Sequence, residues 1–377
     1  MKIVIAPQAF KGSLQACEAA NAMQKGVAAV DAAIQTVLLP IADGGSGTVR
    51  AMVEATGGQL IDTAVHGPLG DTVTAAWGIL GDSLTAVIEM SAASGLSLIP
   101  KDKLDPLKAS TFGTGELILA ALNSGCRSVI IGLGDSATVD GGAGMAEALG
   151  IRLLDEKGNQ IPRGGGGLPL LHHIDSSGRH SLIETARISG ACDVTNPLYG
   201  PEGAAEVYGP QKGATPDMVR QLDAALRHFA AIVARDTGRN IGTLPGGGAA
   251  GGLGAGLVAF LGATLQSGVD LVCDSIGFDE HLAGADLVLV GEGRMDFQTA
   301  FGKTAVGIAR RAKQQNVPVV ALCGELGDGY ENVYAHGIDA VMSILPRCMD
   351  KTEAMGAAPL LLEEATERAI RLFLARR

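Results

Sequence analysis

The stretch LVLVGEGRMDFQTAFGKT, from Leu287 to Thr304, guides the interpretation of the whole chain. Its apolar start predicts a buried strand that stops at Gly291, followed by a glycine-spaced, charged turn over 291–296 and a helix from about residue 304. Crowded charges at the end of a buried strand need a ligand, a metal or each other. The turn therefore predicts a charged-ligand site or a salt-bridged loop. Its charged residues are Glu292, Arg294 and Asp296, and Lys303 follows.

The same order of short β-branched run, glycine-rich turn and helix recurs along the chain. Strands are predicted over 2–6, 35–39, 127–131, 286–290, 317–322 and 339–343. The last helix is predicted over 352–374. Strict alternation of strand and helix indicates an α/β protein with parallel sheets covered by helices on both faces. Ligands of such sheets bind outside the carboxyl ends of the strands, where these turns lie.

The middle of the chain alternates less regularly and suggests a second domain. Residues 156–186 are polar, contain four consecutive glycines and predict a surface loop. We predict a discontinuous α/β domain from residues 1–64 and 285–377, with a second α/β domain inserted over 65–284. The unit at 127–150 fits either domain.

Composition limits the classes of function. The 377 residues are 47% hydrophobic and 18% charged, as expected for about two well-packed domains. A net charge of −11, an aromatic content of 3% and the lack of a Lys/Arg cluster argue against nucleic acid and membranes as partners. The six scattered cysteines predict reduced thiols. Without a recognisable signal peptide or membrane span, we expect a cytoplasmic protein, and a homodimer is compatible with the sequence.

Two nucleotide-binding motifs are matched only in part. Gly132 to Ala137, with Asp155 downstream, has the spacing of a dinucleotide fingerprint. However, Asp135 and Asp140 in that turn would face the phosphates, so a dehydrogenase using NAD(H) is only a rival hypothesis. The segment 302–304 resembles the end of a P-loop, but Phe297 stands where that loop needs glycine.

Other glycine-rich segments allow two interpretations each. The segment Lys11-Gly12-Ser13 predicts an anion site or a simple helix N-cap at Ser13. The uncharged run 245–256 predicts a backbone cradle for phosphate or a helix packed very close to its neighbour. Residues 191–214 carry polar side chains on glycine and proline turns, as a substrate site or a bare long loop would. Any metal should be Mg²⁺ on oxygen ligands.

Seven of these motifs, in this order, carry a resemblance to a known family. They are APQAFKGSL from Ala6, ADGGSGT from Ala42, GDSATVDGGAGMAEALG from Gly134, ACDVTNPLYGPEGAA from Ala191, YGPQKGAT from Tyr208, PGGGAAGGLGAG from Pro245 and GEGRMDFQ from Gly291. Over its whole length the chain resembles bacterial type I glycerate kinases. The resemblance implies ATP-dependent phosphorylation of D-glycerate with Mg²⁺, with the 2-hydroxyl as the favoured acceptor and 2-phosphoglycerate as the product. It also implies a discontinuous Rossmann- or flavodoxin-like domain, a second α/β domain and an active site in the cleft between them.

The resemblance and the chemistry of phosphoryl transfer together assign roles to particular residues. The predicted catalytic residues are Lys11, Asp193, Asp296 and Lys303. The predicted substrate-binding residues are Asp43, Asn196, Lys212 and Arg294. The predicted nucleotide-binding residues are Gly141, Gly142, Gly246, Gly247, Gly248, Gly251 and Gly252, and the predicted Mg²⁺ ligands are Glu292 and Asp296. Whether Asp193 or Asp296 accepts the hydroxyl proton is left open.

The chain also departs from the family pattern near the expected site. Members often carry other residues at the positions of Gln8, Ala9, Ser46, Asp135, Val139, Phe297 and Phe301. Two alternatives follow: a kinase for a different small hydroxy acid, or a catalytically weak homologue that senses a ligand. The residues alone do not decide between the 2- and the 3-phosphate as product.

Overall fold

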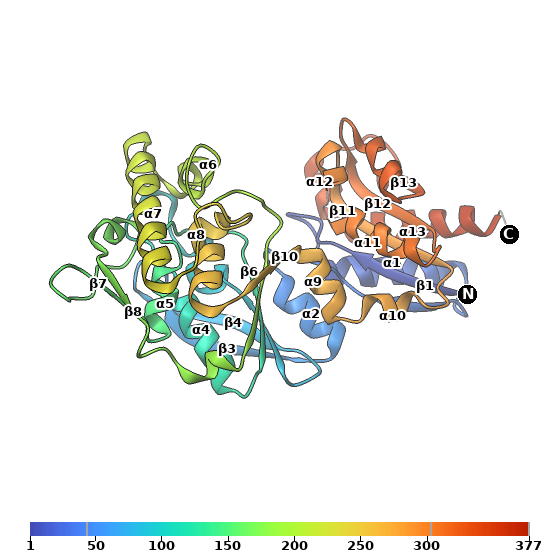
Figure 1. The fold of residues 1–377 in the computed structure, drawn as a ribbon. Helices are drawn as coiled ribbons and strands as arrows, with labels where there is room; N and C mark the ends of the chain where they lie inside the picture. Colours follow the sequence, from blue (N-terminus) through green and yellow to red (C-terminus); the bar gives the residue numbers. More distant parts are fainter. Residues whose placement is uncertain (43, 302–303, 376–377) are drawn as a thin grey trace. The chain divides into compact units, whose positions relative to one another are not determined.

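The computed structural model describes residues 1–42, 44–301 and 304–375. The chain divides into two compact α/β units, and the colours of Figure 1 show that both chain ends belong to the same unit. The first unit comprises residues 1–43, 50–56 and 269–377, and the second comprises 44–49 and 57–268. The 127–150 segment, which fitted either predicted domain, lies in the second unit.

The first unit is built on a five-stranded sheet in which all strands are parallel. Its strands are β1 (Lys2–Pro7), β2 (Gln35–Leu38), β11 (Leu287–Met295), β12 (Val319–Leu326) and β13 (Ala340–Ser343). The spatial order β13-β12-β11-β1-β2 becomes 2-1-3-4-5 when these strands are counted along the chain. This is the flavodoxin-like order, so the predicted fold class is confirmed.

Helices cover both faces of this sheet. They are α1 (Ala16–Val30), the larger part of α2 (Thr48–Thr56), α9 (Gly268–Ser275), α10 (Phe278–Leu282), α11 (Thr304–Gln314), α12 (Lys351–Gly356) and α13 (Ala358–Ala375). Ile3 and Ile5 of β1 pack with α1 and α13 in one core cluster, and Val4 between them is equally buried. The prediction of one terminal helix is wrong. Helix α12 ends at its C-cap Ala357, and α13 begins with Pro359 in its first turn, where proline is tolerated.

The sheet of the second unit has six strands in the order β10-β9-β6-β5-β4-β3. The strands are β3 (Gln59–His66), β4 (Thr72–Ile79), β5 (Thr85–Glu89), β6 (Ser128–Gly132), β9 (Arg187–Ala191) and β10 (Thr264–Gln266). β5, β6, β9 and β10 run parallel, whereas β3, β4 and β5 pair antiparallel. The expectation of parallel sheets throughout is therefore wrong for this unit, because the β3–β4 hairpin adds two antiparallel strands to the sheet.

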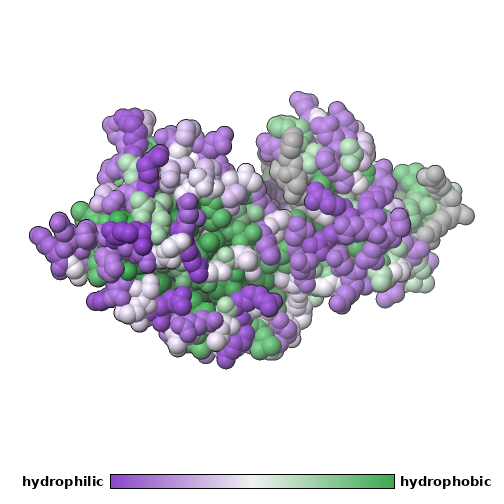
Figure 2. Space-filling view, in the orientation of Figure 1, coloured by the Kyte–Doolittle hydropathy of each residue, from purple (hydrophilic) through white to green (hydrophobic). Residues whose placement is uncertain are grey.

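The helices of the second unit enclose a large apolar core. They are α3 (Ser91–Ser94), α4 (Phe112–Asn123), α5 (Ala143–Ala148), α6 (Ala204–Tyr208), α7 (Pro216–Thr237) and α8 (Ala249–Gly256). On the face shown in Figure 2, hydrophilic residues cover much of the outer side of α7. Among the described residues, no helix combines the length and the hydropathy that a membrane span needs.

The polar segment 156–186 is not a surface loop, which corrects the prediction. It contains a short helical segment, η3 (Gly165–Leu170), and the strand β8 (His173–Asp175), which pairs with β7 (Arg152–Leu154). Leu168 is fully buried, and a Cβ added at Gly167 would lie 1.9 Å from the carbonyl oxygen of Pro162. The glycines are there because the segment folds tightly onto itself and onto the core.

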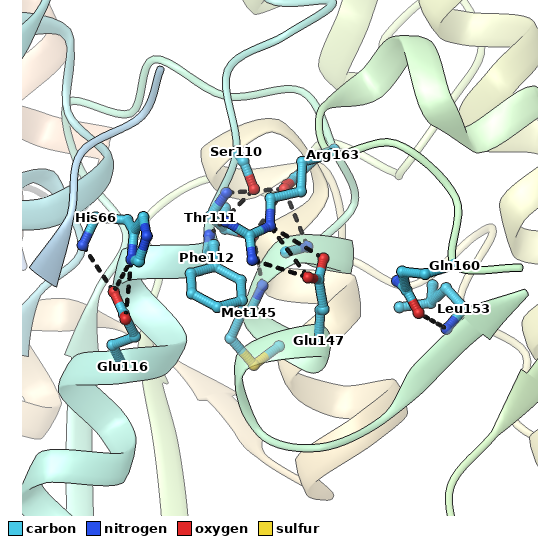
Figure 3. A network of polar contacts seen from close by, with 12 residues as sticks. His66, Ser110, Thr111, Phe112, Glu116, Met145, Glu147, Leu153, Gln160 and Arg163 are labelled. Atoms are coloured by element: carbon cyan, nitrogen blue, oxygen red, sulfur yellow. Dashed lines mark hydrogen bonds and ion pairs between the residues drawn. The ribbon is translucent and has the colours of Figure 1, made fainter. Parts of the chain in front are cut away.

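Arg163 holds this segment against two helices (Figure 3). Its guanidinium lies 3.4 Å from the centre of the Phe112 ring in α4 and donates to both carboxylate oxygens of Glu147 in α5. The Phe112 ring also packs in a T-shaped arrangement with the His66 ring, whose Nδ1 lies 3.0 Å from Glu116 Oε1. These contacts connect β3, α4, α5 and the glycine-rich segment.

Candidate active site

The first unit has a topological switch point between β1 and β11. In open α/β sheets, ligands bind at the carboxyl ends of the two strands where the strand order reverses. The chain leaving β1 crosses over β11 here: Gln8 N–H donates to the carbonyl oxygen of Gly291 at 2.7 Å. A Cβ added at Gly293 would lie only 3.2 Å from the backbone nitrogen of Lys11. The predicted residue Lys11 therefore lies beside the charged end of β11.

Glu292 and Arg294 belong to β11 itself and Asp296 directly follows it, so the prediction of a turn from Gly291 is wrong. β11 continues to Met295 because its pairing with β12 continues, with Glu292 opposite Cys323 and Arg294 opposite Glu325. Gly293 allows the backbone after β1 to approach the strand, and Gly291 leaves room for the Met23 side chain. Glu292 is buried, whereas the Arg294 side chain is 56% exposed. Residues two apart on a strand share a face, so both side chains leave the same side of β11.

Arg294 interacts with two carboxylates at this edge, those of the predicted residue Asp296 and of Glu325, which was not predicted. Arg294 Nε lies 3.2 Å from Asp296 Oδ2, and another nitrogen of the same guanidinium lies 3.3 Å from Glu325 Oε1. Asp296 Oδ1 accepts the backbone N–H of Gln298 at 2.9 Å, which fixes the carboxylate. Arg294 thus already has two carboxylate partners, which an incoming anion would have to join or replace. The predicted residues Asp43 and Lys303 lie outside the described residues.

At the second sheet, Asp193 follows the carboxyl end of β9 and is exposed. Its Oδ1 accepts the backbone N–H of Gly268 at 2.8 Å. Asn196, three residues further on, is engaged at both ends of its amide: Nδ2 donates to the carbonyl oxygen of Glu202 at 2.8 Å, and Oδ1 accepts the Tyr208 hydroxyl at 2.7 Å. Asp193 is therefore presented to solvent, while Asn196 holds its loop together.

Lys212 is almost completely buried, with 1% of its surface exposed. Its Nζ donates to Ser136 Oγ and to the carbonyl oxygen of Thr138, both at 2.7 Å. Burial lowers the pKa of Lys212 to about 7, and the nearby negative charge of Asp140 opposes this shift. Its neighbours make Lys212 a cross-link between its own turn and the loop between β6 and α5.

Asp140 in the same loop connects two helix N-termini. Its Oδ2 accepts the N–H and the hydroxyl of Thr111, both at 2.8 Å, just before α4. Gly142 and Gly144, at the start of α5, donate their N–H groups at 3.1 and 3.2 Å. Burial raises the pKa of Asp140, and these hydrogen bonds oppose the rise. Carboxylates are favourable at helix N-termini, so this aspartate is a shared cap.

Gly251 and Gly252 pack directly against the backbone of residues 138–141, whereas Gly248 packs against the Pro197 carbonyl oxygen. A Cβ added at Gly251 would lie 1.8 Å from the carbonyl oxygen of Thr138, and one at Gly252 would lie 2.7 Å from Gly141 Cα. Several of the predicted phosphate-binding N–H groups have acceptors inside the unit. They are those of Gly141, Gly142, Gly247, Gly248 and Gly252. These contacts favour close packing over a phosphate cradle, and binding of nucleotide by these glycines stays a prediction.

One carboxylate at this edge was not predicted. Glu89, the last residue of β5, accepts the N–H groups of Gly47 and Val49 at 3.0 and 2.9 Å. Burial raises the pKa of Glu89, and the charge of Asp135 adds to the rise. Asp135 has a left-handed backbone with φ of 56°, and its Oδ2 accepts the Ser46 hydroxyl at 3.0 Å. The sequence does contain a signal for this residue, because Glu89 is a carboxylate at the end of an apolar strand.

The strand order and the charged carboxyl edges define an α/β protein whose first unit is flavodoxin-like. The model of the glycerate kinase family matches residues 3–374. A glycerate kinase of Halalkalibacterium halodurans is 52% identical over 96% of both chains. A glycerate 2-kinase of Escherichia coli K12 is 49% identical over 95% of this chain and 94% of its own. A crystal structure from Salmonella typhimurium LT2, 47% identical, superposes with a TM-score of 0.91 and covers 100% of this chain and 98% of its own. The chain belongs to the glycerate kinase family, as the sequence motifs implied.

Proposed function

We propose that this protein transfers the γ-phosphoryl group of ATP to the 2-hydroxyl of D-glycerate, which gives 2-phosphoglycerate and ADP. The observation that carries the proposal is the 49% identity, over 95% of the chain, to a relative named glycerate 2-kinase. The relatives that match over nearly full length and are named glycerate kinases support glycerate as the substrate. Phosphoryl transfer of this kind depends on positioning and on neutralising charge more than on covalent chemistry.

The charged end of β11 suits the recognition of a small hydroxy acid. Arg294 presents a planar guanidinium that can bind a carboxylate through two parallel hydrogen bonds. Its present partners Asp296 and Glu325 keep it oriented at the edge of the sheet. In this proposal Arg294 binds the glycerate carboxylate, and Lys11 and Lys303 neutralise phosphate oxygens.

Mg²⁺ would be held by Glu292 and Asp296. Among the described residues there is no cluster of three or more His, Cys, Asp or Glu that could hold a metal by itself. Mg²⁺ bound with ATP needs only one or two protein carboxylates, because phosphates and water complete its shell. Two carboxylates at one strand end fit that requirement. When bound, the ion supplies charge neutralisation at the transferred phosphoryl group.

Two aspartates are candidates for accepting the hydroxyl proton. Asp193 and Asp296 each have one oxygen fixed by a backbone N–H group, from Gly268 and Gln298 respectively. Such fixation favours a general base, since geometry decides its efficiency before its pKa does. The choice between the two decides which unit supplies the base. We propose that Asn196 and Lys212 act by holding the loops near Asp193, and that the glycines at 141–142 and 246–252 support the nucleotide site in the same way.

A coupled assay tests the proposal. The protein is incubated with D-glycerate, ATP and Mg²⁺, and the product is passed to enolase without a phosphoglycerate mutase. An enolase signal is expected, because enolase accepts only the 2-phosphate. Release of ADP without that signal would identify another product, such as the 3-phosphate. No ADP release with D-glycerate, combined with turnover in a screen of other hydroxy acids, would overturn the assigned substrate.

A further inference from the structure

Exposed aromatic rings are concentrated at one place in this aromatic-poor chain. The sequence has one Trp, four Tyr and eight Phe. Among side chains whose exposure the structure describes, Phe297 and Tyr334 are the two most exposed aromatics, at 49% and 45%. Both belong to the first unit and follow neighbouring strands of its sheet: Phe297 is the second residue after β11, and Tyr334 comes after β12.

The segments that carry these rings are in contact. Phe297 N–H donates to the carbonyl oxygen of Asp328 at 3.0 Å, and a Cβ added at Gly329 would lie 2.9 Å from Phe297 Cβ. The next residue, Tyr330, places its ring edge-on to that of Tyr334, with 6.4 Å between the ring centres. We call Phe297, Tyr330 and Tyr334 the aromatic ledge.

The ledge adjoins the charged end of β11. Phe297 follows Asp296 in sequence, and Leu326, which is also exposed, pairs with Met295 across the two strands. This is the carboxyl edge of a flavodoxin-like sheet, next to the switch point where such sheets bind nucleotides. An apolar surface that continues from a charged site is expected to contact the uncharged part of the same ligand.

The charges around the ledge select which part of a nucleotide fits. Glu325, Asp328 and Glu331 are exposed next to it, and the nearby cation Arg294 is already paired with Asp296 and Glu325. Acidic neighbours repel a triphosphate, but their oxygens accept hydrogen bonds from an exocyclic amino group. A flat, uncharged ring with such a group therefore fits, and aromatic side chains provide stacking partners for nucleobases.

We infer that the aromatic ledge binds the adenine ring of ATP by stacking. This inference rests on the proposed function, because it places one substrate of that reaction. It assigns to Phe297 a contact with the base, whereas Arg294 and Asp296 act on glycerate and on the phosphates with their magnesium.

Binding of ADP with Mg²⁺ tests the inference without requiring turnover. We expect Phe297→Ser to weaken ADP binding about tenfold, the stacking contribution of one aromatic, and Tyr334→Ser to weaken it less. The KM for ATP should rise in parallel, while the KM for D-glycerate stays within about twofold. Leu170→Ser is the matched control, because Leu170 is 55% exposed in the second unit. Thermal unfolding of each variant checks that the fold is intact.

A fluorescent reporter gives a second readout. Trp77, the single tryptophan, is buried in the second unit. Emission from an exposed Phe297→Trp variant should be quenched by ADP, and emission from Leu170→Trp should not. ADP affinity unchanged by Phe297→Ser, an equal loss in Leu170→Ser, or no ADP binding to the unaltered chain would each overturn the inference.

Different experimental outcomes would refute the inference and the proposed function. If Phe297→Ser weakens ADP binding but the unaltered protein never phosphorylates glycerate, the proposed function is refuted and the base subsite stands. If glycerate is phosphorylated and Phe297→Ser leaves ADP binding and the KM for ATP unchanged, the ledge is refuted and the function stands.

Discussion

The buried ammonium of Lys212 lies 2.7 Å from Ser136 Oγ. A lysine placed this deep is tolerated only when its donors are satisfied and a countercharge is near. Ser136 and the Thr138 carbonyl supply acceptors, and the charge of Asp140 favours the ammonium. The loop between β6 and α5, which carries Asp135, is therefore fixed by one side chain from a distant turn.

Replacing this lysine should affect both stability and its dependence on pH. Lys212→Met leaves Asp140 buried without its cation and should lower the free energy of unfolding by about 3 kcal/mol, as for other broken buried pairs. The native pKa of about 7 is below the ordinary value of 10.5. Between these values the unfolded chain holds the proton that the folded chain has lost, so the contribution of Lys212 to stability rises with pH. Urea unfolding from pH 7 to 10 should show that rise weakened in Lys212→Met.

Ser136→Ala is the control for this experiment. It removes one acceptor and keeps the ammonium, so it should cost about 1 kcal/mol and retain the pH slope. A slope in Lys212→Met as steep as that of the unaltered protein would show that other groups cause it.

Asp296→Asn and Asp193→Asn test the two candidate bases. An amide keeps the size of the side chain but cannot accept the hydroxyl proton, so the true base variant should lose about 10²–10⁴-fold in kcat. Circular dichroism and thermal unfolding should stay close to those of the unaltered chain, since both carboxylates lie at sheet edges. Near-normal turnover in either variant removes that residue from the mechanism.

Gly251→Ala tests whether the glycine run serves close packing. The new Cβ would lie 1.8 Å from the Thr138 carbonyl oxygen, on a backbone with φ of +68°. Left-handed strain and overpacking together should cost roughly 3 kcal/mol or more. Gly238→Ala separates the two effects, because Gly238 has φ of +72° and nothing within 4 Å of its added Cβ. Denaturant unfolding should show a loss of only about 1 kcal/mol there; equal losses would contradict the packing role.

Arg163→Met tests the attachment of the glycine-rich segment shown in Figure 3. It removes the cation over Phe112 and the pair with Glu147, and should cost about 1–2 kcal/mol. The amide of Gly166, which donates to the Leu107 carbonyl oxygen, should exchange its hydrogen faster. Arg152→Met is the control, since the ion pair of Arg152 with Asp175 is at the surface and should contribute little. Unchanged exchange at Gly166 would mean that the core alone holds the segment.

Short β-branched runs predicted the strands of the first unit, because strands buried on both faces are continuously apolar. Lys2–Pro7 and Val319–Leu326 are examples. The extension of β11 through Glu292 and Arg294 could not be predicted from an apolar run. It depends on pairing with β12, whose residues lie about thirty positions downstream. The sequence therefore predicted the charged residues Glu292 and Arg294, but not the strand that carries them.

Contacts between segments far apart in sequence also explain other features that were not predicted. Glu89 is held by Gly47 and Val49, which are 42 and 40 residues away in sequence. The glycines near Gly167 carry no sequence signal that separates a folded, buried turn from a mobile one. The β3–β4 hairpin was not predicted either, although Pro68 and Gly70 are turn residues between its two strands.

The position of β1 beside β11 has a consequence for biosynthesis. The backbone N–H of Lys2 bonds to Asp286, 284 residues later. At synthesis rates of roughly 5–20 residues per second, the first strand waits roughly 14–57 s for its central partner to be made. The first five strands of the six-stranded sheet in the second unit, from Gln59 to Ala191, are complete well before that time. β1 can pair early with β2, but its other edge stays open for this period. An apolar strand with one open edge is a natural target for chaperones and is prone to aggregation in the nascent chain.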